Sequence, residues 1–222
     1  DLGLGIDGSV SSAIIQPDGR TILAGYFKSV DGHNRNGIAR VNYDGSIDTT
    51  FNPGGGADNP ILDIALQEDG KIIIVGNFST FNGQNSNKIA RLNIDGTIDH
   101  TFNVGSGADL SINDVVLQKN GKLLVVGDFK IIGEKVCNGI ARLNYDGSID
   151  TTFESGDGFN DSVRLVRLQD DGRILVGGFF TKFNSKDINR VIRLNANGSL
   201  DETFNIGSGA NGSVYSMAVQ SD

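Results

Sequence analysis

A period of 51 residues runs through this chain without insertion or deletion. Four repeats account for 204 of the 222 residues, and the last eighteen restart the pattern. A fixed period of this length is typical of repeat architectures, in which each unit buries its faces against its neighbours. The interval is set by three series, which are Phe51, Phe102, Phe153 and Phe204; Gln16, Gln67, Gln118, Gln169 and Gln220; and Arg40, Arg91, Arg142 and Arg193.

Each repeat also contains two Asx-Gly pairs at fixed positions between apolar runs. Asn and Asp tolerate a left-handed backbone and glycine carries no Cβ, so such pairs favour the tight turns of β-hairpins. Two hairpin turns per repeat are therefore predicted. The eight pairs are Asp18-Gly19, Asp69-Gly70, Asn120-Gly121, Asp171-Gly172, Asp44-Gly45, Asp95-Gly96, Asp146-Gly147 and Asn197-Gly198.

The apolar runs between these turns read as strands. In the first repeat we expect strands over residues 10–16, 21–27, 37–42 and 46–51, with the same pattern in the later copies. The runs are short, rich in β-branched residues and bounded by glycine, which argues against helices. The second strand is apolar on successive residues, as in Ile72-Ile73-Ile74-Val75, so we expect it to be buried on both faces.

Four short antiparallel strands per repeat are the ingredients of a propeller blade. The predicted fold is all-β: a β-propeller, or an open propeller segment, of four 51-residue, four-stranded blades plus one extra strand. The chain is expected to be a single repeat domain over 1–222. A β-solenoid is the open alternative, although solenoids usually have shorter repeats and fewer hairpin turns. The blades are expected at about 10–52, 61–103, 112–154 and 163–205, and 206–222 would start a fifth repeat.

The extra strand raises a question of closure. Residues 214–220 repeat residues 10–16, so in a closed ring of four blades the two segments would compete for one position. One of them would then have unpaired backbone groups, which proteins avoid. We therefore expect self-association, or a larger parent chain, through the strand 214–220.

The combined motif resembles a known repeat. Residues 67–72, 75–78, 89–99 and 101–103 are similar to the delta-sixty repeat of bacterial surface and secreted proteins. The resemblance covers essentially the whole chain. It implies a β-propeller-like fold and an extracellular or bacterial cell-surface location, and it implies no activity and no catalytic residues.

The composition limits the kinds of partner that the chain is expected to bind. The net charge of −8 and the acidic isoelectric point of about 4.7 disfavour nucleic acid, whose phosphates an acidic surface repels. No apolar run reaches 18 residues, so no membrane span is expected. Cys137 is the single cysteine, which excludes an intrachain disulfide and a multi-cysteine metal site. Protein or carbohydrate is left as the expected partner.

Polar residues that recur in every repeat are best explained by architecture. Arg40 and Asp48, with their counterparts, flank the second turn, and a partly buried Arg–Asp contact is expected in each blade. Residues 42–48 also place oxygen side chains at alternate positions around a glycine, as calcium loops do. Arg40 would fall on the first ligand position and the closing glutamate is missing, so Ca²⁺ is not favoured and no metal or cofactor is predicted.

Function is expected where the repeats differ. The loops 28–36, 79–87, 130–138 and 181–189 vary, as does one position early in the first strand, and in a ring these would lie near the central opening. Phe81 and Phe183 among amides would suit a sugar ring, although Val30 and Ile132 at the same position leave a buried apolar role open. The predicted ligand-binding residues are Asp31, His33, Arg35, Phe81, Asn82, Gln84, Asn113, Glu134, Lys135, Arg164, Phe183, Asn184, Lys186 and Asp187.

No catalytic set can be assembled from these residues. His33 and His100 occupy different repeat positions, and neither forms a recognisable set with a nucleophile. The sequence therefore predicts a noncatalytic extracellular binding or scaffold module, with a glycan or protein ligand on the variable-loop face. A structural repeat array that acts as a spacer is the second hypothesis. A propeller glycosidase or lyase is the third, and it would need paired carboxylates or an arginine cluster on that face.

Overall fold

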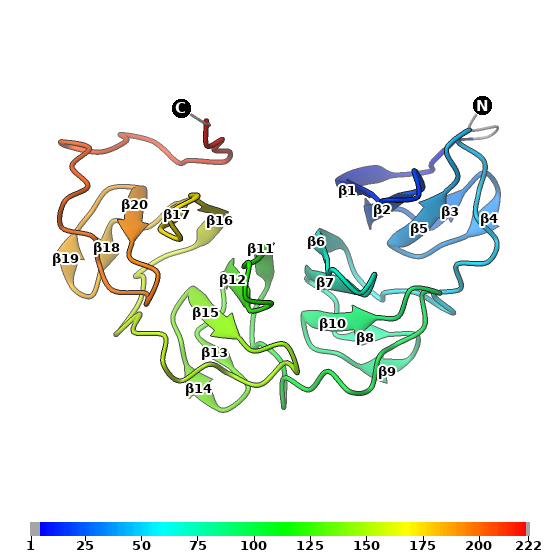
Figure 1. The fold of residues 1–222 in the computed structure, drawn as a ribbon, viewed down its shortest axis with the longest axis horizontal. Coiled ribbons are helices and arrows are strands. Elements are labelled where there is room, and N and C mark those ends of the chain that lie inside the picture. The colour runs from blue at the N-terminus through cyan, green and yellow to red at the C-terminus, as the bar shows by residue number, and fades with distance from the viewer. Residues whose placement is uncertain (1–4, 221–222) are drawn as a thin grey trace. The chain divides into compact units, whose positions relative to one another are not determined.

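A computed structural model describes residues 5–220 of the chain and contains strands and turns but no helix in that range. Residues 1–4 and 221–222, which belong to the predicted domain, lie outside the described part. The chain groups into two compact units that divide between Phe102 and Asn103, called unit 1 and unit 2 below (Figure 1).

Each unit contains two blades, and each blade is a three-stranded antiparallel sheet. The first, second and third repeat strands pair in that order, as the sequence predicts, so the all-β propeller blade is confirmed. Blade 1 consists of β1 (Ser9–Ile15), β2 (Thr21–Tyr26) and β5 (Ile38–Val41), and blade 2 of β6 (Ile61–Leu66), β7 (Ile72–Gly76) and β10 (Ile89–Leu92). Blade 3 consists of β11 (Ile112–Leu117), β12 (Leu123–Gly127) and β15 (Ile140–Leu143), and blade 4 of β16 (Val163–Leu168), β17 (Ile174–Gly178) and β20 (Val191–Leu194).

The predicted fourth strand is reduced to a single bridge in each blade. In blade 1 this bridge joins Val41 to Ile47. The ladder stops at Asp48 because its carboxylate accepts hydrogen bonds from the Thr50 backbone N–H (2.9 Å) and hydroxyl (2.6 Å). Such a local side-chain turn competes with continued strand pairing. The expectation of a full fourth strand is therefore corrected to three strands and a bridge.

The predicted extra strand also differs from the structure. Residues 214–220 run along blade 4 without forming a strand. One backbone hydrogen bond, from the Val214 N–H to the Gly178 carbonyl at 3.2 Å, attaches them. A single hydrogen bond does not make a β-ladder, so the predicted extra strand over 214–220 is absent from the described structure.

Each loop between the second and third strands contains a short hairpin that the sequence analysis did not anticipate. Two of the turns carry an Asx-Gly pair, Asp31-Gly32 and Asn82-Gly83, and in both the Asx residue has a positive φ of 49° or 47°. The hairpins are β3 (Ser29–Val30) with β4 (His33–Asn34), β8 (Thr80–Phe81) with β9 (Gln84–Asn85), β13 (Ile131–Ile132) with β14 (Lys135–Val136), and β18 (Lys182–Phe183) with β19 (Lys186–Asp187).

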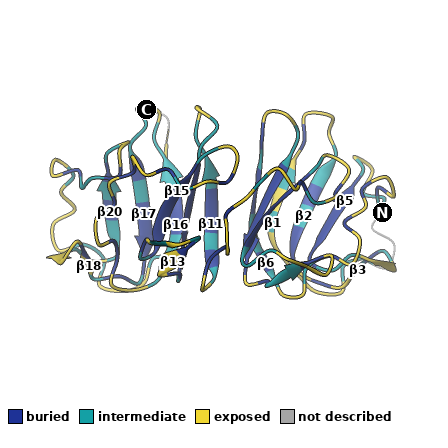
Figure 2. Ribbon diagram, turned by 90° about the horizontal axis from the view of Figure 1, so that it is seen from below, coloured by how far each residue is buried: buried dark blue, intermediate teal, exposed yellow. Residues whose placement is uncertain are grey.

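The hydrophobic core of each unit lies between its two blades. In unit 1, Ile22, Ile38 and Phe51 of blade 1 meet Ile61 and Ile74 of blade 2. Unit 2 repeats the arrangement between blades 3 and 4. The second strands β7 and β12 are buried along their whole length, as their unbroken apolar runs predict, and exposed residues gather in the turns and hairpins (Figure 2). A single sheet has too little thickness to bury both faces, so each blade depends on its neighbour.

Candidate functional site

The variable loops and the crossovers between blades lie on one side of each unit, here called the loop side. In unit 1 the crossover residue Ala57 forms a backbone bridge to Phe81 of the β8–β9 hairpin. The carboxylate of Asp58 accepts hydrogen bonds from the backbone N–H groups of Ser79 (2.8 Å) and Thr80 (3.0 Å). These contacts attach the crossover to the β8–β9 hairpin, so the loop side of unit 1 is an ordered surface.

Of the fourteen predicted ligand-binding residues, six lie in unit 1 and eight in unit 2, and the eight residues within unit 2 do not form one site. In unit 2, Asn113 and Arg164 belong to β11 and β16, which lie on one side of the unit, whereas the hairpins β14 and β19 lie on the opposite side (Figure 1). The hairpins lean away from the first strands, so their tips and the strand residues are separate groups. The structure of unit 2 therefore separates the charged hairpin residues from Asn113 and Arg164.

Four of the predicted residues support the fold. Phe81 and Phe183 are fully buried at the same apolar position as Val30 and Ile132, so neither ring is available to stack on a ligand. The side-chain oxygen of Asn82 accepts a hydrogen bond from the Gly55 backbone N–H at 2.9 Å. Asn184 does the same for Gly158 at 3.0 Å.

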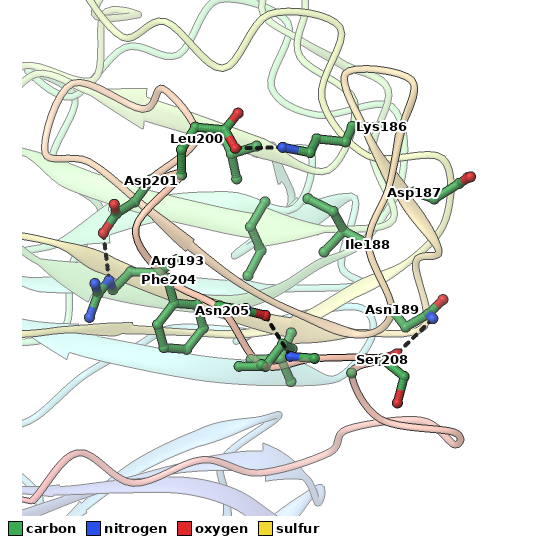
Figure 3. Close-up of a pocket in the computed structure, with 16 residues that line it drawn as sticks. Lys186, Asp187, Ile188, Asn189, Arg193, Leu200, Asp201, Phe204, Asn205 and Ser208 are labelled. Atoms are coloured by element: carbon green, nitrogen blue, oxygen red, sulfur yellow. Dashed lines mark hydrogen bonds and ion pairs between the residues drawn. The ribbon is translucent and has the colours of Figure 1, made fainter.

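The charged hairpin residues are at least partly exposed, and their contacts are with neighbouring surface residues. Arg35 donates to the Asn34 carbonyl (2.8 Å), and Asp187 is paired with Lys182 at 3.2 Å. Lys186 forms an ion pair with Glu202 at 2.5 Å, beside a cavity of about 340 Å³ in blade 4 (Figure 3). His33, Gln84 and Glu134 are exposed, and Asp31 and Lys135 are half-buried.

A different feature of the loop side recurs in both units, a cleft at the junction of the two blades. In unit 2 this junction cleft has a volume of about 290 Å³, and in unit 1 about 200 Å³. The ten lining positions are the same in both, two periods apart. They are Gly25, Tyr26, Phe27, Lys28, Asn36, Gly37, Ala57, Asp58, Asn59 and Pro60 in unit 1, and Gly127, Asp128, Phe129, Lys130, Asn138, Gly139, Phe159, Asn160, Asp161 and Ser162 in unit 2.

The two junction clefts share a frame but differ in chemistry. The glycines, one phenylalanine, one lysine and one asparagine are common to both. In unit 2, Asp128 and Asp161 replace Tyr26 and Asn59 of unit 1, and Ser162 replaces Pro60. Sequence reasoning missed these residues. The signal was present, because the residue that follows the second strand differs in every repeat.

The variable position in the first strand coincides with a β-bulge. The pairing of β11 with β12 shifts register between Ile112 and Asp114, which leaves Asn113 outside the ladder. The same shift occurs around Ser11, Leu62 and Arg164 in the other blades. A bulged residue is free of the strand's pairing pattern, and its side chain is aimed differently from those of its neighbours.

In unit 2 the bulge connects Asn113 with the junction cleft. Its amide nitrogen donates to the carboxylate of Asp128 (3.0 Å) and to the Val163 carbonyl (2.9 Å). The hydroxyl of Ser162 also donates to Asp128. Among the described residues, no donor meets the buried side-chain oxygen of Asn113. A buried acceptor without a partner is uncommon and marks a place where a ligand donor would be stabilised.

Arg164, the bulged residue of blade 4, stacks its guanidinium over the ring of Phe179 at 4.6 Å. Its Nε is buried and has no hydrogen-bond partner within the described range. Arg164, like Asn113, is therefore a bulged residue of unit 2 with a buried polar atom that has no hydrogen-bond partner in the described range.

The repeated acidic residues serve the architecture, as predicted. Arg40 Nε contacts Asp48 at 2.7 Å, and the same pair recurs as Arg91–Asp99, Arg142–Asp150 and Arg193–Asp201. Burial raises the pKa of the Cys137 thiol, which is unfavourable for a nucleophile. In residues 5–220 no cluster of three or more His, Cys, Asp or Glu side chains is arranged to hold a metal ion. The same range contains no helix that could span a membrane.

The comparison with the Doa1 domain agrees with this architecture, and two further solved structures align at lower TM-scores. The chain aligns with the WD40 β-propeller domain of Doa1 at a TM-score of 0.54 and 17% identity, over 83% of this chain and 51% of that one. A protein of unknown function from Bacteroides caccae aligns at 0.47 and 15% identity, over 86% and 65%. PorZ, a surface component of the type-IX secretion system of Porphyromonas gingivalis, aligns at 0.48 and 17% identity, over 76% and 24%. At these identities the likeness concerns the fold alone. The chain spans less than two thirds of the length of each.

No curated protein matches the sequence. The family described as "Domain of unknown function (DUF5122) beta-propeller" matches residues 16–51, 67–102, 118–153 and 169–204, once in every repeat. These segments run from the glutamine that follows each first strand to the phenylalanine after the fourth-strand bridge, and together they make up more than half of the chain. The chain therefore belongs to the DUF5122 β-propeller family.

Proposed function

We propose that the chain is a noncatalytic binding module that acts outside the cell or on a bacterial surface and holds its ligand in the junction cleft of unit 2. The observation that supports this is the pair of equivalent clefts with unequal chemistry. The frame is the same in both units, so the added Asp128, Asp161 and Ser162 are not needed to build it. Polar groups that the fold does not require are candidates for recognition. The resemblance to delta-sixty repeats supports the extracellular setting.

The groups in this cleft favour a carbohydrate over an apolar ligand. Carboxylates accept hydrogen bonds from sugar hydroxyls. Asn113 does not line the cleft, but its amide nitrogen donates to the carboxylate of Asp128 and so orients it. Lys130 and Asn138 add donors for hydroxyl oxygens, and the ring of Phe159 adds an apolar wall. The proposal thus keeps Asn113 from the predicted ligand-binding residues and moves the centre of the site from the hairpins to the junction cleft.

A glycan array is the first experiment, followed by calorimetric titration of the best ligand. Asp128→Asn and Asp161→Asn should each weaken binding at least about tenfold, equivalent to about 1.4 kcal/mol, because each removes the charge of an acceptor. Asp170→Asn, at an exposed position in a turn of unit 2, is the matched control and should leave affinity unchanged. Equal affinity in all three variants would rule out the cleft as the site.

Two other functions make different predictions in the same experiment. A spacer array would bind no glycan even at millimolar concentration. A glycosidase or lyase would cleave the ligand, and the two carboxylates in one cleft are the observation that keeps this third function under test. Product analysis after prolonged incubation distinguishes cleavage from binding.

A further inference from the structure

The junction cleft of unit 1 contains an aromatic ring that lies open to solvent. Tyr26 lines this cleft and is 64% exposed. The equivalent position in unit 2 is Asp128, and the two rings that line the cleft there, Phe129 and Phe159, are buried. An exposed ring in the wall of a cleft can stack on the apolar face of a sugar while its hydroxyl bonds a polar group. Unit 1 therefore offers a stacking surface that unit 2 lacks.

Two further side chains in the lining of this cleft carry polar groups that the fold does not use. Lys28 and Asn59 are both exposed. Within residues 5–220, the Lys28 ammonium, the Asn59 amide and the Tyr26 hydroxyl form no hydrogen bond or ion pair with another residue. Unused polar groups around one cleft are what a hydroxylated ligand needs for its orientation.

The carboxylates near Lys28 are occupied by the backbone of the hairpins. Asp7 accepts hydrogen bonds from the backbone N–H groups of Lys28 (2.8 Å) and Ser29 (2.9 Å). Asp58, the only carboxylate among the ten lining residues, accepts from two backbone N–H groups at the start of the β8–β9 hairpin. Both carboxylates thus hold the loops in place, and neither is paired with the Lys28 ammonium.

A second cationic residue stands beside Lys28. The backbone N–H of Arg35 donates to the Lys28 carbonyl at 2.8 Å, so the two residues are neighbours across the base of the β3–β4 hairpin. Arg35 Nη1 donates to the Asn34 carbonyl at 2.8 Å, and the buried Nε has no hydrogen-bond partner in the described part of the chain. The unused groups in and beside this cleft are therefore mainly donors, two of them on cations.

The cleft of unit 2 has the opposite balance in the same frame. Asp128 and Asp161 stand where unit 1 has a ring and an amide, and Lys130 occupies the position of Lys28. Carboxylates only accept hydrogen bonds, and they repel an anion. An acidic ligand is therefore disfavoured in unit 2, although the lysine is present in both clefts.

We propose that the junction cleft of unit 1 is a second binding site, and that it takes a saccharide with an anionic group, a carboxylate or a sulfate. The sugar ring lies on Tyr26, the anionic group accepts from the Lys28 ammonium, and the Asn59 amide bonds a ring hydroxyl. An anionic group offers acceptors only, which matches the donors of this cleft. The inference does not depend on the proposed ligand site in unit 2, so either can fail without the other.

Calorimetric titration of the whole chain tests this site. The probes are a short oligosaccharide of galacturonic acid and its methyl ester, which keeps the ring and removes the charge. We expect one molecule per chain, and the acid should bind at least about tenfold more tightly than the ester. A sulfated galactose oligosaccharide, titrated in parallel, distinguishes a sulfate from a carboxylate. Binding of neither anionic sugar up to about 5 mM would overturn the proposal.

Variants locate the site. Lys28→Gln removes the cation, and Asn59→Asp adds a carboxylate at unchanged size, so each should weaken binding of the preferred anionic sugar at least about tenfold. Tyr26→Ala should weaken the acid and the ester alike, because stacking does not depend on the charge. Lys119→Gln, at an exposed position in a turn, is the charge-matched control and should leave affinity unchanged.

The two clefts are told apart by their equivalent lysines. Lys130→Gln removes the lysine of unit 2, and a loss of affinity as large as that of Lys28→Gln would overturn the proposal, because the anion would then follow lysine charge at large. Unchanged affinity in Lys28→Gln, or an ester that binds as tightly as the acid, would overturn it equally. Circular dichroism confirms that each variant is folded before its affinity is compared.

Discussion

The four arginine–aspartate pairs place eight full charges within a small repeat protein. Burial alone would raise the pKa of Asp48, but hydrogen bonds from Thr50 and from Arg40 and Arg20 outweigh it and hold that pKa well below the usual range. In Asp201, the hydrogen bond from Thr203 is the largest cause and the pKa falls to about 2. These carboxylates are therefore ionised at neutral pH and hold the backbone that follows the second turn of each blade.

The pH dependence of stability follows from these shifts. A carboxylate whose pKa is lower in the folded state stabilises the fold above the unfolded value of about 3.9, and this contribution is lost as pH falls through the folded value. We expect the free energy of unfolding to be flat between pH 7 and about 5 and to fall steadily below about pH 4. Urea unfolding at several pH values measures it. An unchanged stability at pH 3 would contradict the assignment.

Arginine substitutions separate the contact between blades from the local ion pair. Arg142→Ala removes the partner of buried Asp150 and the hydrogen bond to the Ala196 carbonyl in the next blade, and we expect it to cost about 3 kcal/mol. Arg193→Ala removes a more exposed ion pair with Asp201 and a long hydrogen bond to Thr203, and a cost of about 1 kcal/mol is expected. Denaturant unfolding of both variants checks the difference, and equal costs would contradict a stabilising role for the contact between blades.

Repeat comparison predicts the arginine–aspartate pairs well, but it does not reveal the residues that line the junction clefts. Arg40 and Asp48 recur at one offset in every copy, and identical copies impose identical contacts. Asp128 and Asp161 could not be placed from the sequence, because their proximity depends on how a crossover from blade 3 returns across the junction with blade 4. Asn113 was found because variation at a strand position is visible in the sequence, even though the bulge that explains it is not.

At the scale of elements, two of the four hairpins are joined to a crossover by one asparagine, Asn82 or Asn184. Asn82 has a φ of 47° and accepts from the Gly55 N–H. Asn82→Gly keeps the backbone conformation and loses the hydrogen bond, so we expect a cost of about 1 kcal/mol. Asn82→Ala adds left-handed strain and should cost about 2 kcal/mol. Thermal unfolding compares the pair. A less stable glycine variant would contradict the strain argument.

The elements that sequence analysis predicts correctly are those with long apolar runs. The second strand of each repeat is a long apolar run bounded by glycine, and β7 and β12 are buried along their whole length, so its type and limits are clear. The fourth strand failed because Asp48 and its counterparts bond their own backbone two residues on, which a hydrophobicity pattern does not reveal. The hairpins were missed because two-residue strands carry no periodicity, although Asp31-Gly32 and Asn82-Gly83 repeat the turn signal used elsewhere.

At the scale of the molecule, the net charge opposes contact between copies. With a charge of −8, two chains repel at long range at neutral pH. Salt screens this repulsion over about 10 Å at 0.1 M. We therefore expect any association between copies of the chain to tighten as NaCl rises from about 20 to about 300 mM, as measured by sedimentation. Weaker association in high salt would indicate that attraction between opposite charges dominates the interface.

The bulge in each first strand has a consequence for how such a protein changes over time. Since Ser11, Leu62, Asn113 and Arg164 take no part in the ladder, exchanging one for another breaks no backbone pairing. Substitution at this one point in every copy therefore leaves the sheet of the blade paired. A tandem array built this way can carry a different side chain at the same place in each copy without a change in its backbone pairing.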